Sequence, residues 1–490
     1  MKAIMKKIAI RLSFISLLLV MLTLTACDDF LDVRPKSEKL ERELFETAQG
    51  FEDAIYGVYS QLQTTNLYGM NMLWGIPEVL AQNLECNSTA MVALSRYNYT
   101  ENDELRQLFS KTWTTAYQTI GYANNILNQL EEKTSADLPL RNYYRGEMLA
   151  VRAMLHFDML RLFAPTNTSS TGIPYSRNYS RDITEFSTVG EVYNYIISDL
   201  QEAETLLSGD ADIIRYPRVN DQYHEFLNYR ETHFNLYAVQ ALLARVYWMK
   251  GDMTNAGQYA EKVINSGKFP LVGETEVQDF MAGTLSPKET IFGVYSTGYT
   301  ETCESYLYNL VSFHSYQAYD DDSGMKHLQP WNAIYDKDID VTTQDFRRGQ
   351  FSKGASQTRW LKMTDYYSLD GFVPTARRSL ISGITLFHTA EMYLIATEAN
   401  LKSNYTKALS LFNTEIQSRG LTALAADKTL TEDMLFNEYH KELFGEGQVW
   451  YNMKRLNKDI ISNVETRTIP ASNDIYVIPI PEEEYAYRQK

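Results

Sequence analysis

The chain has 490 residues and a formal net charge of −16 at pH 7, with 62 acidic and 46 basic side chains. A protein with this excess of carboxylates repels phosphate backbones, which argues against nucleic acid as a partner. The length is enough for one large domain or for two to three ordinary ones. The 35 tyrosines each join a flat apolar face to a polar tip, which suits a wet binding surface as well as a core.

Residues 1–26 have the order of a secretory signal, with basic residues first, an apolar run over 12–24, and small residues before Cys27. A spanning helix needs about 20 predominantly apolar residues, so this run is too short for one. The stretch ends in Leu-Thr-Ala-Cys, which resembles a bacterial lipobox, and Asp28 and Asp29 resemble the acidic signal of surface lipoproteins. We therefore expect 1–26 to be a lipoprotein signal peptide and Cys27 to carry the lipid anchor. An ordinary cleaved signal with a chance cysteine is the alternative.

Helical periodicity dominates most of the remaining chain. In 233–250 apolar residues recur at the spacing of one buried helical stripe, a Gly-Asp pair breaks the pattern, and 255–267 repeats it. Such a pair resembles a tetratricopeptide unit of about 34 residues. Thr188 and Glu191 have the spacing of a capping box at the start of another helix. The expected helix pairs are 103–132 with 139–163, 188–207 leading toward 233–250, 233–250 with 255–267, and the two helices of 389–416.

The region 268–375 breaks the helical pattern. It is rich in Gly, Ser, Asp and aromatic residues, and it contains strand-like fragments such as ETIFGVYS at 289–296. An irregular stretch of this length inside a helical protein is usually functional. The predicted fold class is therefore mostly α, with tetratricopeptide-like hairpins forming a scaffold over about 40–267 and 376–460. Loops and short strands of the irregular region pack on this scaffold.

The sequence contains few motifs that would support catalysis. It contains no G-x-S-x-G, H-E-x-x-H, P-loop or G-x-G-x-x-G motif. His388 and Glu391 have helical spacing, but two ligands do not close a zinc site, and the aspartates of 336–340 fail the EF-hand pattern. We predict no enzyme activity, no cofactor and no metal site. The sequence leaves open whether Cys86 and Cys303 pair.

Binding of a sugar needs only a flat aromatic side chain for the apolar face of the ring and polar groups for its hydroxyls. Tryptophans and tyrosines of this kind lie in the irregular segments, although a loop tryptophan more often covers the core than contacts a ligand. Trp113, Trp248 and Trp450 lie on helices or in a motif and are expected to be core residues. The predicted ligand-binding residues are Trp74, Asn83, Asn87, Tyr316, Tyr319, Trp331, Tyr335 and Trp360.

Several motifs, in order along the chain, resemble SusD/RagB-family outer-membrane lipoproteins. They are CDDFLDVRP (27–35), RAMLHFDMLRLFAP (152–165) with GIPY (172–175), ALLARVYWMKGDMTNAGQYAEKVI (241–264), QDFRRGQF (344–351), TAEMYLIATEA (389–399) and YVIPIPEEEY (476–485). The sequence departs from the family at His388, where an arginine is common, and at Val449 and Asn452, where an arginine and an aspartate usually follow Glu446-Gly447. These changes put local salt bridges in doubt more than they do the fold.

The resemblance implies a single SusD-like domain over 27–490, at the cell surface and anchored in the outer membrane through Cys27. It implies non-catalytic binding of an oligosaccharide and its delivery to a TonB-dependent, SusC-like outer-membrane transporter for uptake. A peptide-binding lipoprotein of the same type remains an alternative, as do a surface glycoside hydrolase and a pure scaffold. The sequence does not identify the glycan.

Overall fold

The computed structural model describes residues 43–180, 182–273, 276, 285–308, 316–320, 327–337, 345–353, 358–363 and 382–488. The chain divides into two units, Met1–Phe51 and Glu52–Lys490. The described part of the first unit is a short helical segment that includes the start of α3. The predicted signal peptide and Cys27 lie outside the described residues. Among the helices that the structure describes, each is too short or too polar to cross a membrane.

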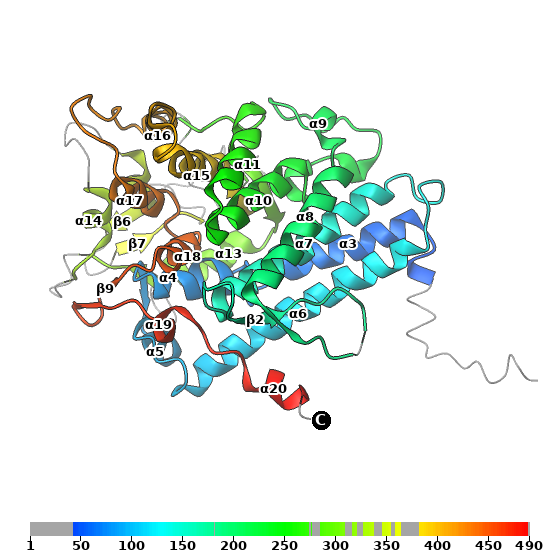
Figure 1. The fold of residues 1–490 in the computed structure, drawn as a ribbon, viewed down its shortest axis with the longest axis horizontal. Helices are drawn as coiled ribbons and strands as arrows, with labels where there is room; N and C mark the ends of the chain where they lie inside the picture. Colours follow the sequence, from blue (N-terminus) through cyan, green and yellow to red (C-terminus); the bar gives the residue numbers. More distant parts are fainter. Residues whose placement is uncertain are drawn as a thin grey trace, which may run out of the picture. The chain divides into compact units, whose positions relative to one another are not determined.

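Long helices form most of the second unit, as expected (Figure 1). The helices are α3 (Ala48–Leu62), α4 (Ile76–Leu80), α5 (Thr89–Ser95), α6 (Asp103–Glu131), α7 (Arg141–Phe163), α8 (Val189–Leu206), α9 (Asp210–Ile213), α10 (Leu236–Lys250), α11 (Met253–Asn265), α13 (Tyr299–Cys303), α14 (Trp331–Tyr335), α15 (Thr389–Leu401), α16 (Tyr405–Ser418), α17 (Glu432–Glu442), α18 (Gln448–Arg455), α19 (Asn473–Tyr476) and α20 (Glu482–Arg488). Short π and 3₁₀ turns lie at η1 (Asn71–Gly75), η2 (Glu225–Leu227), η3 (Arg230–Thr232), η5 (Glu304–Tyr308) and η6 (Phe346–Gln350).

Consecutive long helices pack against one another, which confirms the predicted pairs. α7 contacts both α6 and α8, α10 contacts α11, and α15 contacts α16. Local signals set the ends of these helices: Thr188 and Glu191 form the full capping box of α8, and Gly251 ends α10 at a φ of +86°. Small residues allow α11 and α15 to approach closely. A Cβ at Gly257 of α11 would lie only 2.7 Å from the Ala399 side chain of α15. The scaffold is thus specified largely by local sequence.

The strands are short and antiparallel, and β4, β5, β6 and β7 lie in the region expected to be irregular. One sheet has the order β1-β5-β7-β6, and β4 pairs with β8, β2 with β3, and β9 with β10. Their bounds are β1 (Leu84–Cys86), β2 (Thr171–Pro174), β3 (Phe186–Thr188), β4 (Thr290–Tyr295), β5 (Tyr316–Ala318), β6 (Phe351–Lys353), β7 (Thr358–Trp360), β8 (Gly383–His388), β9 (Ile460–Ser462) and β10 (Arg467–Ile469). The predicted fold class, mostly helical with short strands added, is confirmed.

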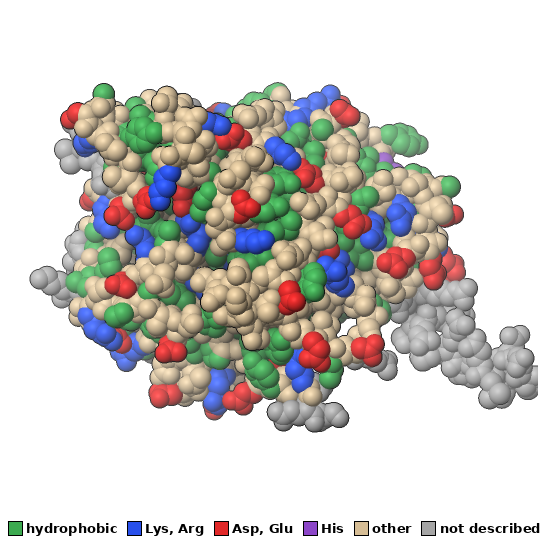
Figure 2. Space-filling view, viewed as in Figure 1, with side chains coloured by type: hydrophobic (Ala, Val, Ile, Leu, Met, Phe, Trp, Pro, Cys, Tyr) green, Lys and Arg blue, Asp and Glu red, His purple; other side chains and the backbone are tan. Residues whose placement is uncertain are grey.

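The surface carries both signs of charge. On the face seen in Figure 2, Asp and Glu side chains alternate with Lys and Arg side chains and do not gather into one patch. Cys86 and Cys303 are both buried and are not joined by a disulfide. The charges of both signs are therefore spread over this face of the molecule.

Candidate functional site

Six of the eight predicted ligand-binding residues are buried, which corrects the expectation of an exposed platform. Trp74, Trp360 and Tyr335 are fully enclosed, and Tyr316, Tyr319 and Asn83 are nearly so. Asn87 is exposed and Trp331 is half-buried. A ring enclosed by protein offers no face to a sugar, so the structure gives the six a packing role. Ligand contact by Asn87 and Trp331 stays a prediction.

The buried aromatics fall into two groups. Trp74 meets Tyr316 edge to face with ring centroids 5.1 Å apart. Elsewhere Trp331 stacks on Phe351 at 4.4 Å, and the same Phe351 packs against Tyr335. These are contacts between segments distant in sequence, which the residue types alone did not reveal.

The remaining members of the predicted set are held by hydrogen bonds. Trp360 Nε1 donates to Gln350 Oε1 at 2.8 Å. The Asn83 amide donates to Glu78 Oε2 at 2.8 Å, and its oxygen lies 2.7 Å from His440 Nε2. Their polar groups therefore have partners inside the protein.

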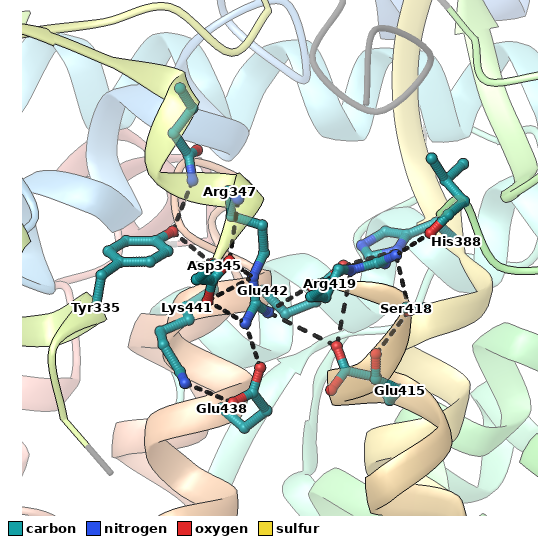
Figure 3. Close-up of polar contacts among 12 residues, drawn as sticks. Tyr335, Asp345, Arg347, His388, Glu415, Ser418, Arg419, Glu438, Lys441 and Glu442 are labelled. Carbon is teal, nitrogen blue, oxygen red and sulfur yellow. Dashed lines mark hydrogen bonds and ion pairs between the residues drawn. The ribbon is translucent and has the colours of Figure 1, made fainter. Parts of the chain in front are cut away.

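Charged side chains form a large buried cluster beside these aromatics (Figure 3). We call it the ion-pair cluster. Its members are Glu289, Asp345, Arg347, Lys362, His388, Glu415, Arg419, Glu438, Lys441, Glu442 and Glu446. The segment QDFRRGQF (344–351) noted in the sequence supplies its centre, because Arg347 binds Asp345 and also reaches Glu438 and Glu442.

Three members of the ion-pair cluster have the chemistry of metal ligands. Glu289, His388 and Glu442 each offer a ligand atom, and these atoms lie within 4.8 Å of one another. The guanidinium of Arg419, however, lies between the two carboxylates and donates to Glu289 at 2.8 and 2.9 Å and to Glu442 at 2.6 and 2.9 Å. A cation would have to displace this arginine, so the trio fits an ion-pair arrangement better than a metal centre.

The protonation states of His388 and Glu415 balance the charges of the ion-pair cluster. Burial acts to lower the pKa of His388, but Glu446, Glu289 and Glu442 outweigh it and raise that pKa to about 10. Burial, followed by Glu438 and Glu442, raises the pKa of Glu415 well above its ordinary value. With an imidazolium at His388 and a neutral Glu415, the cluster holds as many cations as carboxylates. Such matching is what a buried group of charges requires.

An open cavity of about 720 Å³ lies elsewhere in the second unit. We call it the tyrosine cleft. Its lining residues are Tyr56, Tyr59, Ser60, Gln63, Glu225, Asn228, Tyr229, Thr232, His233, Tyr295 and Ser382. The volume is that of a site for a molecule of a few rings.

One wall of the tyrosine cleft is a single face of α3. Tyr56, Tyr59 and Ser60 are three and four residues apart, so they line up along one side of the helix, and Gln63 follows directly after its last residue. The Tyr56 side chain is 43% exposed, whereas Tyr59 is buried below it. The wall therefore presents an open aromatic face with hydroxyl and amide groups beside it.

A second wall contains a strained residue. Tyr229 has a φ of +52°, in the left-handed region that a bulky side chain rarely adopts, and it is 50% exposed. Three hydrogen bonds hold it there: its N–H donates to Asn220 Oδ1 at 2.7 Å, and its carbonyl accepts from the N–H and the hydroxyl of Thr232 at 2.7 and 2.9 Å. Strain that the surroundings maintain is characteristic of ligand-binding positions.

The floor of the tyrosine cleft is a network of buried polar groups. The Tyr59 hydroxyl donates to Glu147 Oε2 at 2.7 Å and accepts from the Phe234 N–H at 2.8 Å. Glu147 also pairs with Arg230 and lies 3.0 Å from His233 Nδ1. Since Arg230 directly follows Tyr229, this network fixes the strained wall to the floor.

The third side is the end of the β4–β8 pair. Tyr295, the last residue of β4, is 54% exposed, and the next residue, Ser296, donates its N–H to the carbonyl of Ser382 at 3.1 Å. The cleft thus brings together segments from four parts of the chain. Sequence reasoning missed it, although the Tyr-x-x-Tyr-Ser-x-x-Gln spacing in α3 was a usable signal for a mixed aromatic and polar helical face.

The electrostatic environment of the tyrosine cleft is negative. Burial, and next the carboxylates of Glu52, Glu147 and Glu225, raises the pKa of Tyr56 to about 12, with Arg230 as the opposing charge. The Tyr56 phenol is therefore a neutral hydrogen-bonding group at physiological pH. Half-exposed rings, hydroxyls, an amide and a carboxylate can adsorb a polyhydroxylated ring.

Comparisons with known proteins agree with this fold. Residues 29–248 match the family described as "Starch-binding associating with outer membrane", and residues 293–487 match the SusD family. The SusD-like protein P2 of Formosa agariphila is 24% identical over 95% of this chain and 96% of its own length. The SusD-like protein P38 of the same organism is 24% identical over 89% of each chain.

Solved structures show the same architecture. A SusD superfamily protein from Bacteroides thetaiotaomicron superposes with a TM-score of 0.71 at 23% identity, covering 90% of this chain and 98% of that one. A laminarin-binding SusD-like protein superposes with a TM-score of 0.60 at 17% identity, covering 90% and 97% of the two chains. The two family matches, which together span most of the sequence, show that the chain belongs to the SusD/RagB family.

Proposed function

We propose that this protein binds an oligosaccharide in the tyrosine cleft without chemically changing it. The observation that carries the proposal is the grouping of three half-exposed tyrosines, Tyr56, Tyr229 and Tyr295, around one cavity. A sugar ring has an apolar face for such side chains and hydroxyls for Gln63, Glu225 and the phenols. The starch-binding description of the family and the laminarin-binding SusD-like neighbour support a glycan as the ligand.

The setting of this binding site follows from the sequence. Cys27 after the signal-like stretch would carry lipid and hold the mature chain at the outer-membrane surface. The captured oligosaccharide would then pass to a TonB-dependent, SusC-like transporter. Metabolic labelling with an alkyne palmitate tests the anchor, because wild type should be labelled and Cys27→Ala should not. Co-purification of a barrel transporter with the wild-type protein tests the partner.

The glycan proposal is tested by isothermal titration calorimetry against starch, laminarin, xylan and mannan oligosaccharides, with a peptide panel alongside. We expect micromolar to millimolar affinity for at least one glycan. Tyr229→Ala and Tyr295→Ala should each weaken it about tenfold, which is about 1.4 kcal/mol. Tyr122→Ala is the matched control, since Tyr122 is a similarly exposed tyrosine on α6 outside the cleft.

Three results would contradict the proposal. Binding of peptides but not glycans would favour the peptide-binding alternative. Glycan affinity unchanged in both cleft variants would place the site elsewhere. Products released from the glycan, and lost in a carboxylate variant, would make the protein a hydrolase.

A further inference from the structure

We infer that the tyrosine cleft selects an uncharged glycan segment and discriminates against segments that carry uronate or sulfate groups. This inference rests on the proposed function and adds the chemical class of the ligand. It depends on which charges line the cleft, which charges stand behind it, and how those behind it are paired.

The first step is the charge of the lining itself. Among the described residues that line the cleft, Glu225 is a carboxylate and none is a lysine or arginine. His233 also lines it but is buried, and its ring nitrogen is directed at Glu147. A carboxylate only accepts hydrogen bonds, so Glu225 suits the hydroxyl donors of a neutral sugar and repels the oxygens of an acidic one.

The second step is the charge behind the lining. Arg230, the residue after Tyr229, is a buried cation, and it is fully engaged by two carboxylates. Its Nε and Nη2 donate to the two oxygens of Asp210 at 2.8 and 3.1 Å, and its Nη1 donates to Glu147 Oε1 at 2.5 Å. The Arg230 charge is therefore matched inside the protein and is not directed at a ligand in the cleft.

The third step is the balance of the remaining groups. Glu52 lies near the Tyr56 end of the cleft, where its charge adds to those of Glu147 and Glu225. His224 Nε2 lies 3.7 Å from Glu52 Oε1. The carboxylates named for the cleft and its floor are those of Glu52, Glu147, Asp210 and Glu225, and they outnumber Arg230 even when His224 and His233 are counted as cations.

The size of the effect follows from Coulomb's law. A single carboxylate about 6 Å from an anionic sugar substituent, at an effective dielectric constant of about 40, weakens binding about tenfold. Salt should reduce the effect, because the Debye length falls to about 3 Å at 1 M ionic strength. A steric cause of discrimination would not respond to salt in this way.

The test compares the tightest-binding neutral hexose oligosaccharide from the panel with the same oligosaccharide oxidised at C6 to uronic acid. Calorimetry is done at pH 8 in about 20 mM salt and again in 1 M salt. We expect the neutral form to bind about tenfold or more tightly at low salt, with the ratio shrinking at high salt. Glu225→Gln should reduce the ratio at low salt to about threefold or less, whereas Asp427→Asn, an exposed acidic residue outside the cleft lining, should leave the ratio unchanged.

Failure of this inference differs from failure of the proposed function. If the oxidised form binds as well as the neutral one, or better, the charge selection is wrong while glycan binding stands. If the ratio is the same in Glu225→Gln as in wild type, Glu225 is not the source of discrimination and the inference is also overturned. If no oligosaccharide binds, both the proposed function and the inference are contradicted.

Discussion

His388 Nε2 lies 3.0 Å from Glu446 Oε2, inside the ion-pair cluster and 58 residues apart in the chain. Glu446 also accepts from Lys362 Nζ at 2.6 Å. The sequence resemblance to the SusD/RagB family places His388 at a position where an arginine is expected. Because its pKa is raised to about 10, the imidazole is protonated and supplies the positive charge that an arginine would.

The first prediction concerns alkaline stability. A histidine whose pKa is about 6.5 in the unfolded chain and about 10 in the folded one contributes stability that is complete below pH 6.5 and is lost as the pH rises to 10. Wild type should therefore lose several kcal/mol of unfolding free energy across this window, as measured by urea denaturation. His388→Arg should remove that loss, because arginine stays charged. Parallel pH profiles for the two proteins would refute the assignment.

The second prediction separates two neighbouring glutamates. Glu442 accepts hydrogen bonds from both Arg347 and Arg419, so Glu442→Gln leaves two buried guanidinium groups short of a counter-charge. We expect it to cost about 3–5 kcal/mol of unfolding free energy. Glu415 has a raised pKa and is already neutral, so Glu415→Gln should cost less than about 1 kcal/mol. Equal losses at pH 7 would contradict the charge balance of the cluster.

The third prediction concerns the strained wall of the tyrosine cleft. Asparagine adopts the left-handed conformation more readily than tyrosine, so Tyr229→Asn should leave the unfolding free energy unchanged or raise it by up to about 1 kcal/mol. The same variant should bind the glycan about tenfold more weakly, because the ring is gone. Tyr295→Asn, at the end of a regular strand, should lose affinity with no gain in stability. A gain in both stability and affinity for Tyr229→Asn would show that the strain serves no binding role.

The fourth prediction compares two glycines with nearly the same backbone. Gly445 and Gly251 have φ values of +83° and +86°. A Cβ at Gly445 would overlap the Trp360 ring, whereas a Cβ at Gly251 would meet nothing within 4 Å. Thermal unfolding should therefore show a loss of several kcal/mol for Gly445→Ala and about 1 kcal/mol for Gly251→Ala. Equal losses would mean that conformation, and not the contact with Trp360, sets the cost.

The helices were predictable because their signals are local. The helix expected at 103–132 is observed at Asp103–Glu131, and the expected break after 250 is the left-handed Gly251. A capping side chain and an apolar stripe act within a few residues of themselves. The resemblance to the SusD/RagB family added the order of the helical pairs, and the fold bears it out.

The orientation of the loop aromatics was not predictable in the same way. Trp360 lies in a strand of the irregular region, but its burial depends on Gly445, 85 residues later, which leaves room for the ring. Tyr335 is buried because its hydroxyl donates to the carbonyl of Lys441 at 2.6 Å. Composition identifies such residues as able to bind a sugar, whereas contacts with distant segments decide whether they face solvent.

The tyrosine cleft was not predicted from the sequence, for a related reason. Tyr56 lies on a helix, where the sequence suggests a packing role, and Tyr229 lies in a segment without a recognisable motif. Only the folded chain shows that both rings border one cavity with Tyr295. The backbone conformation of Tyr229, which sets it apart, has no signature in residue type.

The ion-pair cluster also bears on how the chain is made. Arg347 and Arg419 are synthesised before Glu438, Glu442 and Glu446, the carboxylates of α17 and the segment after it. A nascent polypeptide that stopped near residue 430 would hold Arg347 beside Asp345 and Arg419 beside Glu289, but it would lack the carboxylates that α17 contributes. The ion-pair cluster can therefore be completed only after the C-terminal part of the chain has been synthesised.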